Sequence, residues 1–382
     1  MKNTAKKVLV AVLVLAMVAV CFAACGNGGT ANGGNDEQKT ILIGGTGPLT
    51  GDASSYGISV KNGATLAVKE INAAGGLNGI KFILDIKDDK ATAEDASTGY
   101  DALMDAGMKI SIGSVTSGSC AAFADKAATD NLFFITPSAS AANVIEKGNG
   151  SYRVCFGDPD QGILAAQELV KTYKNIGCIY DTSDPYSSGI FDAFKGEMAK
   201  LGVEFALQTF DAENKKDFST QAEALKECDV VFTPFYYTEA GLVTKALVAK
   251  GSKAVVFGCD GLDGIADQIE GVKSKVKVMY ITPFDVNSKE ETTAKFVEAY
   301  KADYSVAPDQ FAADGYDAVY AIFNALKAGN INAADMEVSD ICDEVVKAIT
   351  DPSFKLVGAT GTMTWDASGA CTKVPQIVEL GD

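Results

Sequence analysis

Residues 41–79 read ILIGGTGPLTGDASSYGISVKNGATLAVKEINAAGGLNG, and this stretch predicts a strand, a loop and a helix in succession. The apolar run 41–43 is typical of a buried strand. Apolar side chains then recur at the spacing of one helix face, at Val60, Ala64, Ala67 and Ile71. The pair Gly75-Gly76 ends the predicted helix. A buried strand that feeds a helix is the unit from which parallel sheets covered by helices are built.

The same alternation of short apolar runs and helical segments continues to residue 280. Further strand candidates cover 82–86, 109–112, 132–135, 153–156, 176–180, 203–210, 230–233, 254–258 and 276–280. Beyond Pro283 the pattern is mainly helical, through 290–304 and 310–326, before a short closing strand at 376–380. This regular alternation predicts an α/β fold of doubly wound parallel sheets with helices on both faces.

The N-terminus has the features of an export signal. A basic start at 2–7 precedes an apolar run at 8–20, and Phe22-Ala23-Ala24-Cys25 follows. The run is too short and wrongly flanked for a membrane span, so residues 1–24 are predicted to be a signal peptide. Cys25 stands where bacterial lipoproteins are cleaved and acylated on sulfur, so we expect a lipid there. The alternative is a plain secreted protein cut after Ala24.

In both cases the mature protein lies outside the cytoplasm, in the periplasm or at the outer face of the cytoplasmic membrane. Residues 26–39 read GNGGTANGGNDEQK and show no apolar periodicity. Such a flexible chain reaches roughly 20 Å root-mean-square. Residues 25–39 are therefore predicted to be a lipid-anchored tether that holds a folded body clear of the membrane.

Composition limits the partners. The chain has 382 residues, of which 47% are apolar, and this length predicts two domains. It carries 33 basic and 50 acidic residues, a net charge of −17. A protein that follows a phosphate backbone needs a basic stripe, so we expect no nucleic-acid partner.

Two residue types are nearly missing. The sequence has no histidine, which excludes Ser-His-Asp and Cys-His catalysis and His-ligated zinc. It has one arginine, Arg153, so a grip on several carboxylates by guanidinium groups is not expected. Gly45-Thr46-Gly47 follows a strand, but Thr50 occupies the third glycine position of a dinucleotide fingerprint. We therefore expect no cofactor, no metal and no enzymatic activity.

The cysteines do not form a recognisable framework. Cys21 leaves with the signal peptide, and seven others have no spacing typical of zinc sites: Cys120, Cys155, Cys178, Cys228, Cys259, Cys342 and Cys371. Most of them lie in apolar stretches, which predicts buried free thiols. One disulfide bridge is the alternative.

Several segments in a fixed order resemble one known family. They are Ile43–Gly51 with Tyr56-Gly57, Gly63-Ala64, Ala67–Asn72, Gly75–Gly79, Asp88-Asp89, Thr136–Ser140, Gly258–Gly261 and Gly315–Tyr320. Together they resemble the leucine/isoleucine/valine-binding family, the extracytoplasmic receptors of branched-chain amino acid ABC importers. The likeness covers essentially the whole mature chain.

The resemblance implies two doubly wound parallel-sheet lobes, joined by three crossovers, that close around a ligand like a flytrap. Lobe 1 would contain residues 40–157 and 283–357, and lobe 2 residues 158–282 and 358–382. A monomer would capture an amino acid, with leucine, isoleucine or valine as first choice, and deliver it to the ABC permease. Alternatives are a ligand-sensing receptor subunit of the same fold, or a binding protein for an aromatic or other neutral amino acid or an amide.

Ligands of open parallel sheets lie beyond the carboxyl ends of the strands, where loops lead into helices. The loops 50–57, 114–119 and 137–140 meet this condition in lobe 1. A ligand carboxylate accepts hydrogen bonds from hydroxyls and backbone N–H groups. The candidates for this role are Ser117, Ser138, Ala139 (through its backbone) and Ser140.

The resemblance also implies an acidic partner for the ligand ammonium, and Asp260 stands at that position. Some family members have Glu there, which is longer. Tyr56, Tyr186 and Tyr236 would line the side-chain pocket from both lobes, with Phe235 and Tyr316 as weaker candidates for the same wall. The alternative for the serines and Asp260 is helix capping, and for the tyrosines a contact between lobes. Arg153 lies in the strand leading to the crossover, where a role in the hinge or in pairing between lobes is expected.

Overall fold

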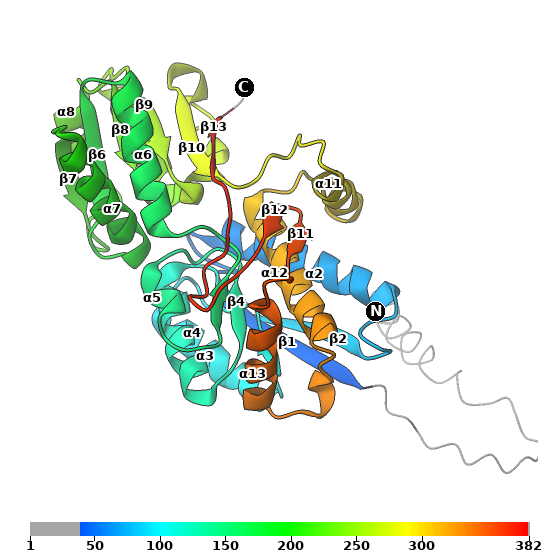
Figure 1. Cartoon of the computed structure of the whole chain (residues 1–382). Coiled ribbons are helices and arrows are strands. Elements are labelled where there is room, and N and C mark those ends of the chain that lie inside the picture. Colours follow the sequence, from blue (N-terminus) through cyan, green and yellow to red (C-terminus); the bar gives the residue numbers. More distant parts are fainter. Residues whose placement is uncertain (1–38, 381–382) are drawn as a thin grey trace, which may run out of the picture. The chain divides into compact units, whose positions relative to one another are not determined.

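The structure is a computed structural model, and it describes residues 39–380 (Figure 1). The predicted signal peptide 1–24, the lipidation site Cys25 and nearly all of the tether 25–39 therefore lie outside the described residues. The described part forms one unit by its internal contacts. Within it, no helix is long and apolar enough to cross a membrane.

The first sheet has five parallel strands in the order β2-β1-β3-β4-β5. Its strands are β1 Thr40–Gly47, β2 Lys81–Asp88, β3 Ile110–Ser111, β4 Phe134–Thr136 and β5 Ser151–Arg153. Its helices are α2 Ser54–Ala73, α3 Ala93–Asp105, α4 Ser117–Asp130, α5 Ala142–Ile145, α11 Glu291–Tyr304, α12 Gln310–Ala328 and α13 Val338–Ile349. A 3₁₀ turn, η3 Ala333–Asp335, precedes α13. Strand β1 is an interior strand between β2 and β3, and its apolar residues serve both faces of the sheet.

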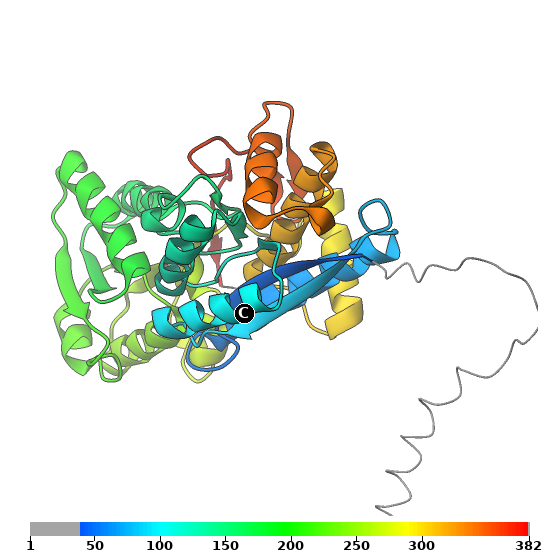
Figure 2. The same ribbon diagram turned by 90° about the horizontal axis from the view of Figure 1, so that it is seen from below.

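Successive side chains of β1 point to opposite faces of the first sheet. Ile41 and Ile43 belong to a core shared with α2 and α12, while Leu42 packs against a second core made with α3 and α4. Helices α2 and α12 pack closely, because Gly63 of α2 leaves no room for a Cβ beside the carbonyl of Ala312. In Figures 1 and 2 the orange helix α12 accordingly lies next to the blue β1–α2 segment.

The second sheet has six strands in the order β13-β10-β9-β8-β6-β7. Five of them are parallel: β6 Ile176–Asp181, β7 Ala206–Phe210, β8 Val230–Thr233, β9 Val255–Gly258 and β10 Val278–Thr282. The closing strand β13 Gln376–Glu379 is antiparallel to β10. Its helical segments are α6 Asp158–Thr172, α7 Pro185–Leu201, α8 Ser219–Leu225, α9 Tyr237–Ala249, η1 Asp260–Leu262, α10 Ile265–Gln268 and η2 Lys273–Lys275. Two doubly wound sheets confirm the predicted fold class.

Three segments connect the two sheets: 154–157, 283–290 and 364–375. Before the third one, β11 Leu356–Gly358 and β12 Gly361–Met363 form a hairpin that the sequence did not predict as strands. Asp317 of α12 accepts hydrogen bonds from the hairpin amides of Ala359 and Thr360, at 2.6 and 2.9 Å. This turn therefore lies with α12, although the predicted lobe boundary assigns residues from 358 onward to lobe 2. The lobe limits stay a prediction.

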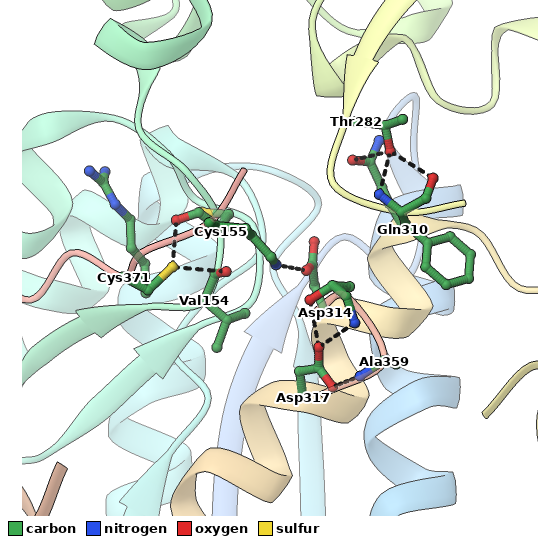
Figure 3. A network of polar contacts seen from close by, with 12 residues as sticks. Val154, Cys155, Thr282, Gln310, Asp314, Asp317, Ala359 and Cys371 are labelled. Carbon is green, nitrogen blue, oxygen red and sulfur yellow. Dashed lines mark hydrogen bonds and ion pairs between the residues drawn. The ribbon is translucent and has the colours of Figure 1, made fainter. Parts of the chain in front are cut away.

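The connecting segments are joined by buried polar contacts (Figure 3). Lys373 of the third segment forms an ion pair with Asp314 of α12 at 2.6 Å, with side chains 1% and 2% exposed. The Cys371 thiol donates to the carbonyl of Val154 in the first segment at 3.2 Å. Thr282, at the start of the second, donates to the Oε1 atom of Gln310 at 3.2 Å. These contacts tie the third connecting segment to the first and to α12, and the second to α12.

Two further sequence predictions have an outcome here. All seven described cysteines are free thiols; five are buried and two, Cys228 and Cys371, are half-buried. The prediction of free thiols is therefore confirmed. Arg153 lies at the end of β5 and donates from Nη1 to the carbonyl of Ser140 at 2.7 Å. Its own carbonyl accepts from the indole of Trp365, so Arg153 joins the end of β5 to the third connecting segment.

Candidate functional site

A small cavity lies between the carboxyl ends of the two sheets and is lined by both. Six of the eight predicted ligand residues meet there: Tyr56, Ser117, Ser138, Tyr186, Tyr236 and Asp260. Val115, Thr116, Gly261 and Phe311 complete the wall. The side chains nearly fill the cavity, since the centre of a water molecule can occupy only about 10 Å³ of it. To bind an amino acid, these side chains must therefore give up contacts among themselves and form contacts with the ligand instead.

The hydroxyl side of the cavity comes from loops of the first sheet. Ser117 is the first residue of α4, where backbone N–H groups of a helix end point outward. Its hydroxyl accepts a long hydrogen bond, 3.3 Å, from the amide of Ala141. Ser138 donates to the carbonyl of Val115 at 2.8 Å. Both residues line the cavity, and each hydroxyl keeps spare hydrogen-bonding capacity.

Two of the predicted residues lie behind this wall. Ala139 and Ser140 are fully buried and do not line the cavity. The amide of Ala139 donates to the hydroxyl of Thr136 at 3.1 Å, so it already has a partner. The hydroxyl of Ser140 has none within the described part of the chain.

The acidic side of the cavity comes from η1, directly after β9. Asp260 is 5% exposed, and its Oδ1 atom accepts from the hydroxyl of Tyr186 at 2.6 Å and the amide of Gly261 at 2.9 Å. The amide of Asp260 donates to Oε1 of Gln161 at 3.0 Å. Burial raises the pKa of Asp260, and the hydrogen bond from Tyr186 opposes this rise.

The tyrosines form an aromatic wall that crosses the cleft. Tyr56, on α2 in the first lobe, donates to the carbonyl of Gly261 and accepts from the amide of Tyr237 at 3.1 Å. Its ring lies 4.2 Å from that of Phe311, which sequence reasoning missed. Tyr186 and Tyr236 stack with ring centroids 5.0 Å apart. The wall therefore offers apolar ring faces to a ligand side chain and links the two lobes.

The weaker wall candidates lie elsewhere. Phe235 lines a second cavity of about 450 Å³, which meets the first at Tyr236 and is also bounded by both lobes. Lys215 pairs there with Glu239 at 3.1 Å and with Asp52 of the opposite lobe at 3.6 Å. Tyr316 lies outside both cavities, because its hydroxyl donates to Glu70 across the α2–α12 contact.

Sequence reasoning also missed two polar residues beside the cavity, Asp158 and Gln161, in the first turn of α6. Both are buried, and Gln161 contacts Asp260 directly. Burial is the largest cause that raises the pKa of Asp158, and the carboxylate of Asp260 adds to it. The nearby hydroxyl of Ser140 and guanidinium of Arg153 act in the opposite direction. The available signal was the segment Asp158-Pro159-Asp160-Gln161, which places an acid and an amide at the helix start after a crossover.

The two sheets, three connecting segments and interlobe cavity define a two-lobed binding protein. The residues 40–369 match the family model described as periplasmic binding protein, so the chain belongs to that family. Proteins of this family are extracytoplasmic binding proteins, in agreement with the predicted location and with the prediction that the chain is not an enzyme.

Individual relatives confirm the resemblance found in the sequence. The Leu/Ile/Val-binding protein BraC3 of Rhizobium johnstonii is 29% identical over 336 residues, 87% of this chain and 89% of that protein. The substrate-binding protein LivJ of Streptococcus pneumoniae, solved with isoleucine, has a TM-score of 0.79 at 26% identity and covers 89% of this chain and 95% of its own. A solute-binding protein of R. palustris solved with benzoate has a TM-score of 0.78 at 18% identity, over 90% and 96%. The last likeness shows the fold alone.

Proposed function

We propose that this chain is the solute-binding lipoprotein of an ABC importer and captures a branched-chain amino acid between its lobes. The observation that carries the proposal is the composition of the interlobe cavity. The cavity is lined by Ser117 and Ser138 from loops of the first sheet, by Asp260 from the second, and by the tyrosines Tyr56, Tyr186 and Tyr236. This arrangement complements a carboxylate, an ammonium and an apolar side chain of one small molecule. The names of the relatives point to the same ligand class.

The contacts in the structure suggest how binding would proceed. The ligand carboxylate would take the hydroxyl of Ser117 and the N-terminal end of α4, and the ammonium would take Asp260 in place of the Tyr186 hydroxyl. Tyr56, Tyr186 and Tyr236 would enclose the side chain. A ligand that contacts both lobes only in the closed state favours closure by its differential affinity.

The proposal includes the predicted anchor. A lipid on Cys25 and the tether 25–39 would keep a monomeric binding domain near the membrane, where it delivers its ligand to the permease subunits. Metabolic labelling with a radioactive fatty acid tests this part, since a Cys25→Ser variant should lose the label.

Ligand-dependent melting tests the function itself. Residues 26–382 are unfolded and refolded to remove carried-over ligand, and the melting temperature is recorded with each of the twenty amino acids. Ligand at a hundred times its dissociation constant stabilises the fold by about 2.7 kcal/mol, which raises the melting temperature by several degrees. Leucine, isoleucine or valine should give the largest shift. A folded protein that responds to no amino acid would contradict the proposal.

A further inference from the structure

Buried polar atoms without partners gather beside the interlobe cavity. Within residues 39–380 they include both carboxylate oxygens of Asp158, the Nε2 atom of Gln161, the hydroxyl of Tyr236 and the hydroxyl of Ser140. Asp158 is 1% exposed, and Ser140 and Gln161 are 0% exposed. Native proteins satisfy nearly all buried polar groups, and an unsatisfied cluster therefore points to groups kept for a ligand.

Asp158 and Asp260 come from different segments but lie in one neighbourhood. Gln161, one turn after Asp158 on α6, accepts the hydrogen bond from the amide of Asp260. On its other side Asp158 packs against α7, where a Cβ on Gly189 would lie 2.7 Å from Oδ2 of Asp158. The hydrogen bonds from Tyr186 and Gly261 to the Asp260 side chain both go to Oδ1, and the side-chain amide of Gln161 lies near enough to lower the pKa of the carboxyl group.

The charge of this neighbourhood is negative. Among the described residues, no lysine or arginine lines the cavity. Arg153 is the nearest cation to act on Asp158, and its Nη1 atom is bound to the Ser140 carbonyl. Asp184, which caps α7 and lines the adjoining 450 Å³ cavity, adds a third acid nearby; Lys90 and Lys215 line that second cavity but not the first. Two buried carboxylates without a dedicated protein cation favour a cationic ligand group.

We propose that Asp158 acts with Asp260 to hold the ammonium of the ligand, and that this pair makes the site select amino acids over acids that lack an amine. An ammonium has three N–H donors and no acceptor. Asp260 and Tyr236 line the cavity. Asp158 is buried beside them and does not line the cavity in this structure, so its carboxylate would act from behind them on the ammonium. This inference rests on the proposed function. It assigns to Asp158 a part in the selection of ligands that carry an amine. The fold alone does not supply this selection, because another protein of the same fold holds benzoate.

The test is calorimetric titration of wild-type 26–382, Asp158→Asn and Asp160→Asn with L-leucine, L-isoleucine, L-valine and 4-methylpentanoate. The last compound is leucine without its amine. Asp160 is the matched control, because it lies in the same helix turn, is exposed, and bonds the amide of Gly157 instead of facing the cleft. Asp158→Asn should weaken leucine binding by about 30-fold or more, as expected for one partner of a buried charge pair. Binding of 4-methylpentanoate should change by less than about threefold, and Asp160→Asn should change neither.

The outcomes separate the two proposals. If wild-type protein binds none of the three amino acids, the proposed ligand class is wrong and this inference falls with it. If wild type binds leucine and Asp158→Asn binds it equally well, or if the variant loses leucine and 4-methylpentanoate to the same extent, the inference alone is overturned. Ligand-free Asp158→Asn should melt at or above the wild-type temperature, because it removes an unpartnered buried charge. If Asp158→Asn does not fold, Asp158→Ser provides the same comparison.

Discussion

Buried carboxylates occur in two regions of this molecule, and they differ in what surrounds them. On α12, Asp314 pairs with Lys373, and Asp317 accepts from two backbone amides and the hydroxyl of Thr360. Beside the cleft, neither carboxylate oxygen of Asp158 has a hydrogen bond within the described residues, although Ser140 and Arg153 lie near enough to lower its pKa. Asp260 accepts hydrogen bonds only from neutral donors. Burial opposes the charged form in both regions. The difference indicates that the α12 acids stabilise the hinge through their ion pair and hydrogen bonds. The cleft acids, by our proposal, gain a positive charge as partner only when the ligand ammonium binds.

We expect the largest effect on stability from replacing Lys373, the cation of the buried ion pair at the hinge. Lys373→Met keeps the length of the side chain but leaves Asp314 buried without its counter-charge. Breaking a buried pair in this way costs about 3–5 kcal/mol. Urea unfolding at neutral pH should show this loss in the free energy of unfolding.

The double variant Lys373→Met/Asp314→Leu is the control for that experiment. It removes both charges and should recover most of the lost stability, because an apolar pair of similar volume replaces a buried ion pair at little cost. If the single variant is as stable as wild type, Asp314 does not depend on Lys373, and the contrast between the two regions fails.

Removing the charge of a cleft acid should weaken ligand binding and leave the stability of the ligand-free protein nearly unchanged. Asp260→Asn keeps an oxygen acceptor for Tyr186 and Gly261 but removes the negative charge. We expect amino acid affinity to fall by about 2 kcal/mol or more, roughly 30-fold, because the ligand ammonium loses its counter-charge. The ligand-free free energy of unfolding should stay within about 1 kcal/mol of wild type.

Asp267→Asn is a suitable control for this measurement, since Asp267 is exposed on the following α10. Titration calorimetry with L-leucine should give it wild-type affinity. An Asp260→Asn protein that binds leucine as tightly as wild type would show that the ammonium lies elsewhere.

The contrast between the regions also explains what the sequence can predict. Strands such as β1 and β6 are apolar runs bounded by turns, and their periodicity is visible without the fold. Tyr56 and Asp260 were found because they lie in segments that resemble a known family. The hairpin β11–β12 was missed because its turn depends on Asp317, a distant residue on α12.

Asp158 was missed for a similar reason. In the sequence it is an acid at the start of a helix, where acids are common as favourable partners of the helix dipole. Its burial and its lack of a hydrogen-bond partner arise only when α7 packs over it and β9 brings Asp260 near. The amide of Ala139 differs from Asp158 in the opposite sense. It was predicted to contact the ligand, but in the folded chain it donates its hydrogen bond to the hydroxyl of Thr136.

Proton release should provide the smallest and most specific distinction between the two regions. Burial raises the pKa values of Asp158 and Asp260 in the ligand-free protein, and the pKa of Asp184 to about 6. A bound ammonium favours the charged carboxylates, so their pKa values fall on binding and protons leave the protein. Leucine affinity should therefore weaken as the pH falls, by up to about tenfold per pH unit for one proton.

The sign of the effect on ligand-free stability is opposite. A carboxyl group whose pKa is raised in the folded state contributes its full stability below its unfolded pKa, and this contribution is lost as the pH rises through the folded value. The contribution of these carboxyl groups to the stability of the ligand-free protein should thus decrease as the pH rises above about 4, while leucine affinity increases. Titrations in buffers of different ionisation enthalpy measure the released protons directly. Asp158→Asn should release fewer than wild type, whereas Asp317→Asn, if it folds, should release the same number, because the hinge acids keep their partners whether or not the ligand is bound.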